Sequence, residues 1–127
     1  MKKLLILVAC LALCVLGVQA QGPTGRAVTQ ITNATTGVTI NTETGVITTV
    51  SLTNAAAAVT TFTVTNSAVS ATSTVVTTVQ GYTGTYGTNG FPIAYVNAVG
   101  AGTFNISVAN TGANALAGVL QIGFVVR

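Results

Sequence analysis

Side chains that could carry out acid–base chemistry are scarce in this sequence. The whole chain has four Lys and Arg residues, one acidic residue and no His. Beyond Ala20 the ionisable side chains are one carboxylate, two guanidinium groups and three phenols: Glu43, Arg26, Arg127, Tyr82, Tyr86 and Tyr95. General acid–base catalysis needs a group that titrates near neutral pH, and glycoside hydrolysis needs two carboxylates. A Ser or Thr nucleophile would lack its base. We therefore expect no catalytic residues and no enzyme activity.

The same inventory argues against metal, cofactor and nucleic-acid sites. Zinc is held by Cys, His and carboxylate ligands, of which only Glu43 remains beyond Ala20. Calcium could use backbone and Asn oxygens, but a single carboxylate does not make a tight site. The formal charge of +3 includes Lys2 and Lys3, so two Arg and one Glu leave +1 beyond Ala20. That is not the basic surface that nucleic-acid binding requires. We expect no metal, no cofactor and no nucleic-acid partner.

The N-terminus has the pattern of a secretory signal peptide. Lys2 and Lys3 precede an apolar run of 15 residues from Leu4 to Val18, and Val18-Gln19-Ala20 places small residues at a cleavage site. The run is shorter than the roughly 20 residues that span a bilayer as a helix. We expect residues 1–20 to be a signal peptide cleaved after Ala20, and the chain to be secreted, with membrane contact only through that segment.

Two other fates of the N-terminus remain open. The segment could be retained as an anchor, or it could be a lipoprotein signal, since Leu7-Val8-Ala9-Cys10 resembles a lipobox. Only six apolar residues precede Cys10, however, which is shorter than the usual apolar region of about 7–15 residues. Cleavage after Ala20 agrees best with the pattern.

Removal of the signal leaves 107 residues with almost no charge and no Cys. This length suits one domain. Cys10 and Cys14 lie in the signal, so the remaining chain forms no disulfide even if it is exported. A surface with almost no net charge tends to self-associate. We expect a homo-oligomer; the alternative is a monomer kept soluble by its Thr, Ser, Asn and Gln side chains.

From Val28 onwards the sequence predicts β-strands. Short runs rich in Val, Thr, Ile and Phe alternate with Gly and Asn clusters. The segments 38–41 and 46–52 are predicted to pair as a hairpin through the turn 41–45, and 93–99 with 103–109 through the turn 100–102. The final strand, 119–126, is the most apolar and is predicted to lie centrally. Thr is expected at outward-facing positions, because its branched side chain suits the pleat and its hydroxyl faces water.

These strands predict an all-β chain. Seven or eight strands at regular spacing indicate a single antiparallel β-sandwich or jelly-roll-like domain. The predicted organisation is a signal peptide at 1–20, an extended leader at 21–33 and a β-sandwich domain at 34–127. The leader contains Gly22-Pro23-Thr24-Gly25-Arg26-Ala27, two triplets of collagen-like spacing, although collagen needs a long run of such triplets. A flexible Gly/Pro leader is the simpler interpretation.

The C-terminal half resembles a known type of domain. The segments 62–67 (FTVTNS), 80–84 (QGYTG) and 115–126 (ALAGVLQIGFVV) are similar to a small β-sandwich module of phage and virus fibre or surface-decoration proteins. The resemblance covers roughly residues 58–127. It implies a trimeric head similar in architecture to C1q and tumour-necrosis-factor domains. It implies no catalytic residues, and a secreted bacterial surface protein that shares the module fits equally well.

The longest predicted loop, Gly81 to Pro92, carries the candidate binding residues. Tyr82, Tyr86 and Phe91 lie there among four glycines. Aromatic side chains on long loops can stack on a sugar ring or anchor a protein interface. The alternative is a loop that packs its aromatic side chains down onto the end of the sandwich. Tyr95 lies within a strand and is expected in the core or in a subunit interface.

Three polar features complete the candidates. Asn33-Ala34-Thr35 and Asn105-Ile106-Ser107 are N-glycosylation sequons, with Asn105 expected to face outward. Chance occurrence is the alternative in a chain this rich in Asn, Ser and Thr. Arg127 and Glu43 could pair across subunits, although an exposed ion pair contributes only about 0–1 kcal/mol.

Two functions follow from these observations. The first is a secreted, non-catalytic structural protein whose copies associate into a trimeric head, a fibre or a surface layer on a cell or virion. In such an assembly, residues 27–32 could donate a strand to a neighbour. The second is an adhesion module that recognises a surface glycan or receptor through the Gly81–Pro92 loop. The sequence does not decide between a closed trimer and an open fibre.

Overall fold

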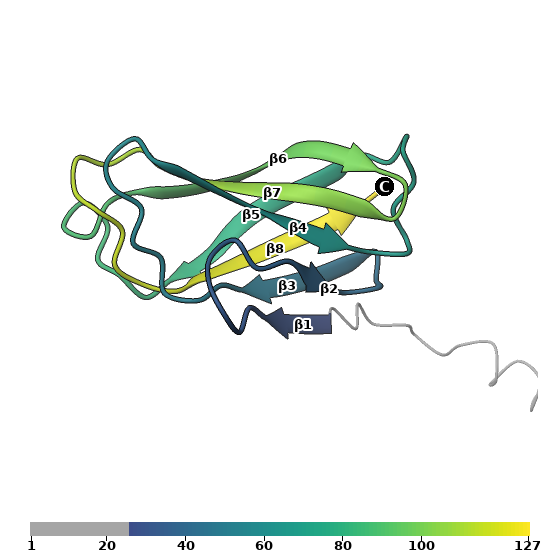
Figure 1. The fold of residues 1–127 in the computed structure, drawn as a ribbon, viewed down its shortest axis with the longest axis horizontal. Helices are drawn as coiled ribbons and strands as arrows, with labels where there is room; N and C mark the ends of the chain where they lie inside the picture. Colours follow the sequence, from purple (N-terminus) through teal and green to yellow (C-terminus); the bar gives the residue numbers. More distant parts are fainter. Residues whose placement is uncertain (1–25) are drawn as a thin grey trace, which may run out of the picture.

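A computed structural model describes residues 26–127, which form two packed β-sheets with no helix (Figure 1). The predicted signal peptide and the first residues of the predicted leader lie outside this range. One sheet has the strand order β1-β3-β8-β5, and the other has β2-β4-β7-β6. The strands are β1 (Arg26–Thr29), β2 (Val38–Thr39), β3 (Thr44–Thr48), β4 (Val59–Thr65), β5 (Val75–Tyr82), β6 (Pro92–Gly100), β7 (Thr103–Asn110) and β8 (Leu120–Val126).

The core lies between the two sheets and comes from alternating positions on their strands. The inner strands contribute most: β7 buries Phe104, Ile106 and Val108, and β8 buries Leu120, Ile122, Phe124 and Val126. Inward and outward side chains alternate because successive residues of a strand face opposite sides of the sheet. The prediction of an all-β sandwich is therefore confirmed, as is the central place of the last strand.

The hairpin near the C-terminus also forms as predicted. Strands β6 and β7 pair antiparallel, and Gly100 lies opposite Thr103 across the turn. Gly102 in that turn has φ of +77°, a left-handed conformation in which a side chain would be strained. Three of the four outward positions of β4 are threonines, Thr61, Thr63 and Thr65, as expected for a pleated face that meets water.

The hairpin predicted for 38–41 and 46–52 is wrong. Strand β2 pairs with β4, whereas β3 pairs with β1 and β8 in the other sheet. Val38 and Ile40 are buried from one sheet and Ile47 from the other, so the intervening turn crosses the sandwich. Alternation of apolar residues identifies a half-buried strand, but it carries no information about which sheet the strand joins.

The sandwich is not purely antiparallel, which corrects a second expectation. Strand β1 runs parallel to β3, and β2 runs parallel to β4. Both parallel pairs involve short strands at the sheet edges, where they cover edge backbone groups that would otherwise be unpaired.

The sandwich also begins earlier than predicted. The predicted leader covers 21–33, but within it Arg26–Thr29 forms β1 and Gln30 is buried. In this short segment only Val28 packs against the core, so its alternation was too brief to signal a strand. Among the described residues there is no helix long and apolar enough to cross a bilayer.

Truncation of a central core side chain tests this packing. We expect Ile122→Ala to lower the free energy of unfolding by about 2–5 kcal/mol, because Ile122 is fully buried and the substitution leaves a cavity. Val76→Ala, at an exposed position of β5 in the same sheet, should change it by no more than about 0.5 kcal/mol. Urea unfolding followed by circular dichroism measures both. Equal effects of the two substitutions would contradict the assigned core.

Candidate functional site

The loop between β5 and β6 brings the three predicted aromatic residues together. The ring of Tyr86 lies 5.4 Å from that of Tyr82 and 5.1 Å from that of Phe91, measured between centroids. Edge-on and tilted arrangements at this distance are favourable for aromatic pairs. The three rings therefore form one cluster at the end of the sandwich, which we call the aromatic end.

Tyr82 serves as the anchor of this cluster. Its hydroxyl donates to the backbone carbonyl of Asn89 at 2.6 Å and accepts from the backbone N–H of Ala117 at 2.9 Å. A Cβ on Gly84 or Gly118 would come within 3 Å of the Tyr82 ring, so glycine at these two positions makes room for it. Tyr82 is half-buried and its hydroxyl is used within the fold, which leaves it little capacity to bind a ligand.

Tyr86 and Phe91 are presented to solvent instead. Their side chains are 49% and 48% exposed. Phe91 is held by its backbone, since its N–H donates to Asn110 Oδ1 at 3.0 Å and its carbonyl accepts from Thr111 N–H at 2.9 Å. Of the predicted binding residues, two therefore offer an exposed aromatic surface, and the third supports it.

Asn110 positions the loops of the aromatic end, a role that no sequence pattern indicated. Its side-chain amide is buried and makes five hydrogen bonds. Nδ2 shares its two hydrogens among three backbone carbonyls, and Oδ1 accepts from two backbone N–H groups; the partners are Asn54, Ala55, Asn114, Phe91 and Gly112. Three loops are thus tied to one side chain. Asn at the end of a strand reads as ordinary turn chemistry, so only its burial reveals this role.

A second candidate surface is the outward side of the β2-β4-β7-β6 sheet, which we call the outer face. Ile93 and Tyr95 on β6 alternate with half-buried residues and are each 42% exposed. Ala109 on β7 lies opposite both Ile93 and Val59 of β4, so an apolar row crosses three strands. Tyr95 is not in the core, which was one of its two predicted locations. Because apolar residues occupy both faces of β6, alternation alone could not show which face points toward the core.

Four polar side chains of the outer face are hydrogen-bonded in two pairs. The hydroxyls of Thr61 and Ser107 lie 2.7 Å apart, and Thr63 Oγ1 donates to Asn105 Oδ1 at 2.9 Å. Ser107 is fully buried between its neighbours although it lies on the outward side. Because these groups already have partners, covering them removes few hydrogen bonds to water.

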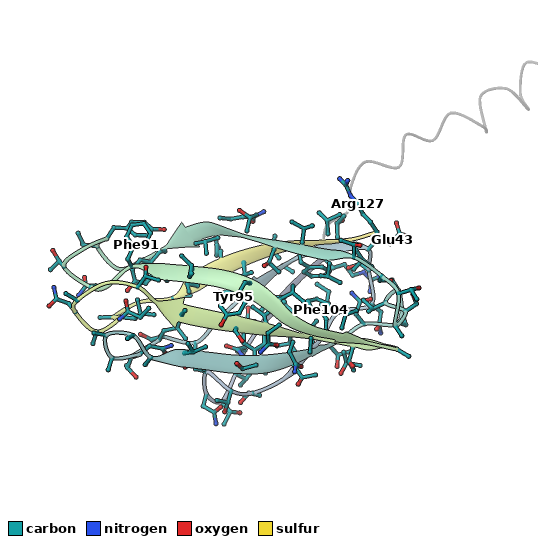
Figure 2. All side chains as sticks on the ribbon, turned by 90° about the horizontal axis from the view of Figure 1, so that it is seen from above. Glu43, Phe91, Tyr95, Phe104 and Arg127 are labelled. Carbon is teal, nitrogen blue, oxygen red and sulfur yellow. The ribbon has the colours of Figure 1, made fainter. Side chains whose placement is uncertain are left out.

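The charged residues lie at the opposite end of the sandwich from the aromatic rings. Figure 2 shows Phe91 at one end and Glu43 and Arg127 at the other. Arg26 is at the same end, since it pairs with Gly45 directly after Glu43 and Thr44. Within residues 26–127, no three His, Cys, Asp or Glu side chains come together as metal ligands.

The two sequons differ in exposure. Asn33 is exposed, and its Oδ1 accepts from Thr35 and Thr36 in a tight turn. Asn105 is half-buried on the outer face, beside Thr63. Asn33 also lines an open hollow of about 640 Å³, whose other lining residues are Thr32, Ala34, Thr35, Val50, Ser51, Thr53, Asn54 and Thr60. This lining offers hydrogen bonds and no ionisable group.

Comparisons of the chain with protein-family models, with curated proteins and with solved structures find no match. The residues themselves are therefore the basis for a functional proposal.

The anchoring role of Tyr82 can be separated from the exposed role of Tyr86 by removing one hydroxyl at a time. We expect Tyr82→Phe to destabilise the fold by about 1–3 kcal/mol, because the Ala117 N–H and the Asn89 carbonyl lose their partner. Tyr86→Phe should stay within about 0.5 kcal/mol of the parent, as expected for an exposed side chain. Thermal unfolding of both variants is the measurement, and a greater loss for Tyr86→Phe would reverse the assignment.

Proposed function

We propose that this chain is a secreted, non-catalytic structural domain whose copies associate with one another on a cell or virion surface. Export rests on the signal-peptide pattern of residues 1–20. The non-catalytic part rests on the side-chain inventory, since the described residues contain one carboxylate, no His and no Cys.

The outer face is the observation that carries the proposal. It combines exposed Val59, Ile93 and Tyr95 with hydroxyl and amide groups that are paired to each other. Burial of apolar surface is favourable, and burial of a polar group costs free energy only when it loses its hydrogen bonds. A second copy of the same uncharged face can cover the apolar row and the two hydrogen-bonded pairs without burying an unpaired charge.

The long sheet edges are poorer sites for association than the face. Strands β5 and β6 each carry a register shift, between Val79 and Gly81 and between Val96 and Ala98. They also approach each other, because Thr77 Oγ1 of β5 donates to the Ala94 carbonyl of β6 at 3.3 Å. Bulges and mutual coverage are devices that discourage pairing with another chain at an edge. Association through the outer face is therefore favoured over pairing at the edge strands β5 and β6.

The form of the assembly is proposed from the resemblance. The resemblance of residues 58–127 to head domains of fibre and decoration proteins favours a jelly-roll-like trimer of the C1q and tumour-necrosis-factor type. A contact that does not close on itself would give an open fibre or a layer instead. We propose the closed trimer as the first form to test.

A charge placed on the outer face tests the proposal. We expect Ile93→Lys to weaken association at least about tenfold, because an unpaired charge or like charges across an interface cost several kcal/mol. The matched control is Val76→Lys, which places the same charge at an exposed position of the other sheet. Size-exclusion chromatography with light scattering on the full chain, expressed for export, gives the mass of each. If Ile93→Lys keeps the parent mass while Val76→Lys dissociates, the interface is on the other sheet.

A second candidate function is adhesion through the aromatic end. The observation that favours it is the exposed pair Tyr86 and Phe91, held in place by Tyr82 and Asn110. A neutral aromatic surface of this kind suits stacking on a sugar ring or contact with an apolar patch of a receptor.

Replacement of both exposed rings tests adhesion. We expect the double variant Tyr86→Ala with Phe91→Ala to lose binding to a target cell surface or immobilised glycan by at least about tenfold, with its solution mass unchanged. Ile31→Ala serves as the control, because it removes an exposed apolar side chain from a different loop. Unchanged surface binding of the double variant would eliminate the aromatic end as the recognition site.

A further inference from the structure

Strand β1 is the least firmly held strand of its sheet. It has four residues, pairs with β3 alone and contributes one half-buried side chain, Val28, to the core. Arg26, Ala27 and Thr29 are exposed. Elements with few buried contacts open at a lower free-energy cost than the core does. As Figure 1 shows, β1 lies at an edge of the molecule, so it can leave without disturbing another strand.

The junction between β1 and the following loop contains an unfavourable polar group. Gln30 is only 3% exposed, and its Nε2 donates to the Thr36 carbonyl at 2.8 Å. Its Oε1 is buried and has no hydrogen-bond partner among the described residues. A buried acceptor without a donor destabilises the conformation that buries it. Opening the loop would return this oxygen to water. The conformation in which β1 stays on its own sandwich is therefore destabilised at Gln30, the residue directly after β1.

The linker after β1 is long enough to reach another molecule. Residues 30–37 separate β1 from β2, and eight extended residues span up to roughly 27 Å. In the structure this segment folds back on itself, with the Thr36 N–H bonded to the Asn33 carbonyl. Extended, it would carry β1 well past the two sheets of its own sandwich, which pack about 10 Å apart.

We propose that copies of this chain exchange β1, so that the strand of one molecule pairs with β3 of its neighbour. Every contact of β1 is available in the neighbour, because the register from Arg26–Gly45 to Thr29–Thr48 and the site for Val28 are the same in each copy. The inference rests on the proposed self-association. The chain's own β1 competes at an effective concentration of roughly millimolar, which only copies held together in an assembly can match. Exchange converts a face contact into a mechanically linked assembly.

Engineered disulfides can distinguish exchange from pairing within one chain. Ala27 and Val46 are direct partners on the outward side of β1 and β3, so the double variant Ala27→Cys with Val46→Cys places two thiols within bridging distance. Cys10 and Cys14 are replaced by Ser in the full chain to leave only these two. A second pair, Thr29→Cys with Thr48→Cys, repeats the test at the next outward position. Ala27→Cys with Thr48→Cys is the control, because its Cα atoms are offset to roughly 8 Å, beyond disulfide reach.

The variants are oxidised as assembled and analysed on a denaturing gel without reductant, beside their mass by light scattering. Exchange predicts that both in-register pairs give covalent dimers or larger species as the major product, at least tenfold more than the offset control. Assembly accompanied by bands of one chain only would overturn the exchange and leave the proposed function standing. A mass of one chain with intrachain disulfides would overturn both. The circular dichroism of the reduced variants must match that of the parent chain.

Discussion

The structure depends on neutral side chains that form hydrogen bonds with the buried backbone groups of its loops. Asn110 is the clearest case, since one buried amide makes five hydrogen bonds to backbone groups of three loops. An unpartnered buried polar group costs about 1–3 kcal/mol, so this side chain offsets several such costs at once. The backbone carbonyl of Asn110 also accepts, at 3.0 Å, from the N–H of Ala57, a non-glycine residue with φ of +61°. The loops of the aromatic end have their positions because Asn110 fixes them.

The same solution recurs elsewhere in the sandwich. At the charged end, buried Asn66 donates from Nδ2 to the Thr42 carbonyl at 2.7 Å and accepts from the Ala68 N–H at 2.9 Å. Toward the aromatic end, Thr49 Oγ1 accepts from the Leu120 N–H at 3.0 Å, which links the loop after β3 to the start of β8. Neutral hydrogen bonds thus replace the ion pairs and disulfides that stabilise many exported domains. A surface almost free of charge is a consequence of this composition.

Much of the fold could be predicted from the sequence, because strong alternation and turn residues identify strands locally. The β6–β7 hairpin and the central β8 are examples, since each has a long alternating pattern and the hairpin has a glycine turn. The partners of β2 and β3 could not be predicted, because the choice of sheet depends on contacts distant in sequence. Residues 27–32 were predicted only as a strand that could be donated to a neighbour, and their place in the chain's own sheet could not be predicted, because only Val28 of β1 packs against the core.

The sequence predicted which residues make up the candidate site, but it did not predict which of them anchors the loop and which are exposed. A glycine-rich loop with three aromatic residues indicates a cluster, and the rings do meet. That Tyr82 anchors the loop through two backbone partners depends on Asn89 and Ala117, which no local pattern connects to it. The outer face was missed because its character comes from pairs across strands, such as Thr61 with Ser107, 46 residues apart.

The proposed self-association through an uncharged face predicts how the mass of the intact chain responds to salt. Its mass should exceed that of one chain, and it should not fall when the salt concentration is raised, because salt screens charges and leaves apolar burial intact. The measurement is light scattering on the exported wild-type chain at two protein concentrations, each at low salt and at about 1 M NaCl, where the screening length is about 3 Å. A mass of several chains that is maintained or increased at high salt is the predicted result. A mass of one chain at both protein concentrations, or an oligomer that dissociates at high salt, would contradict it.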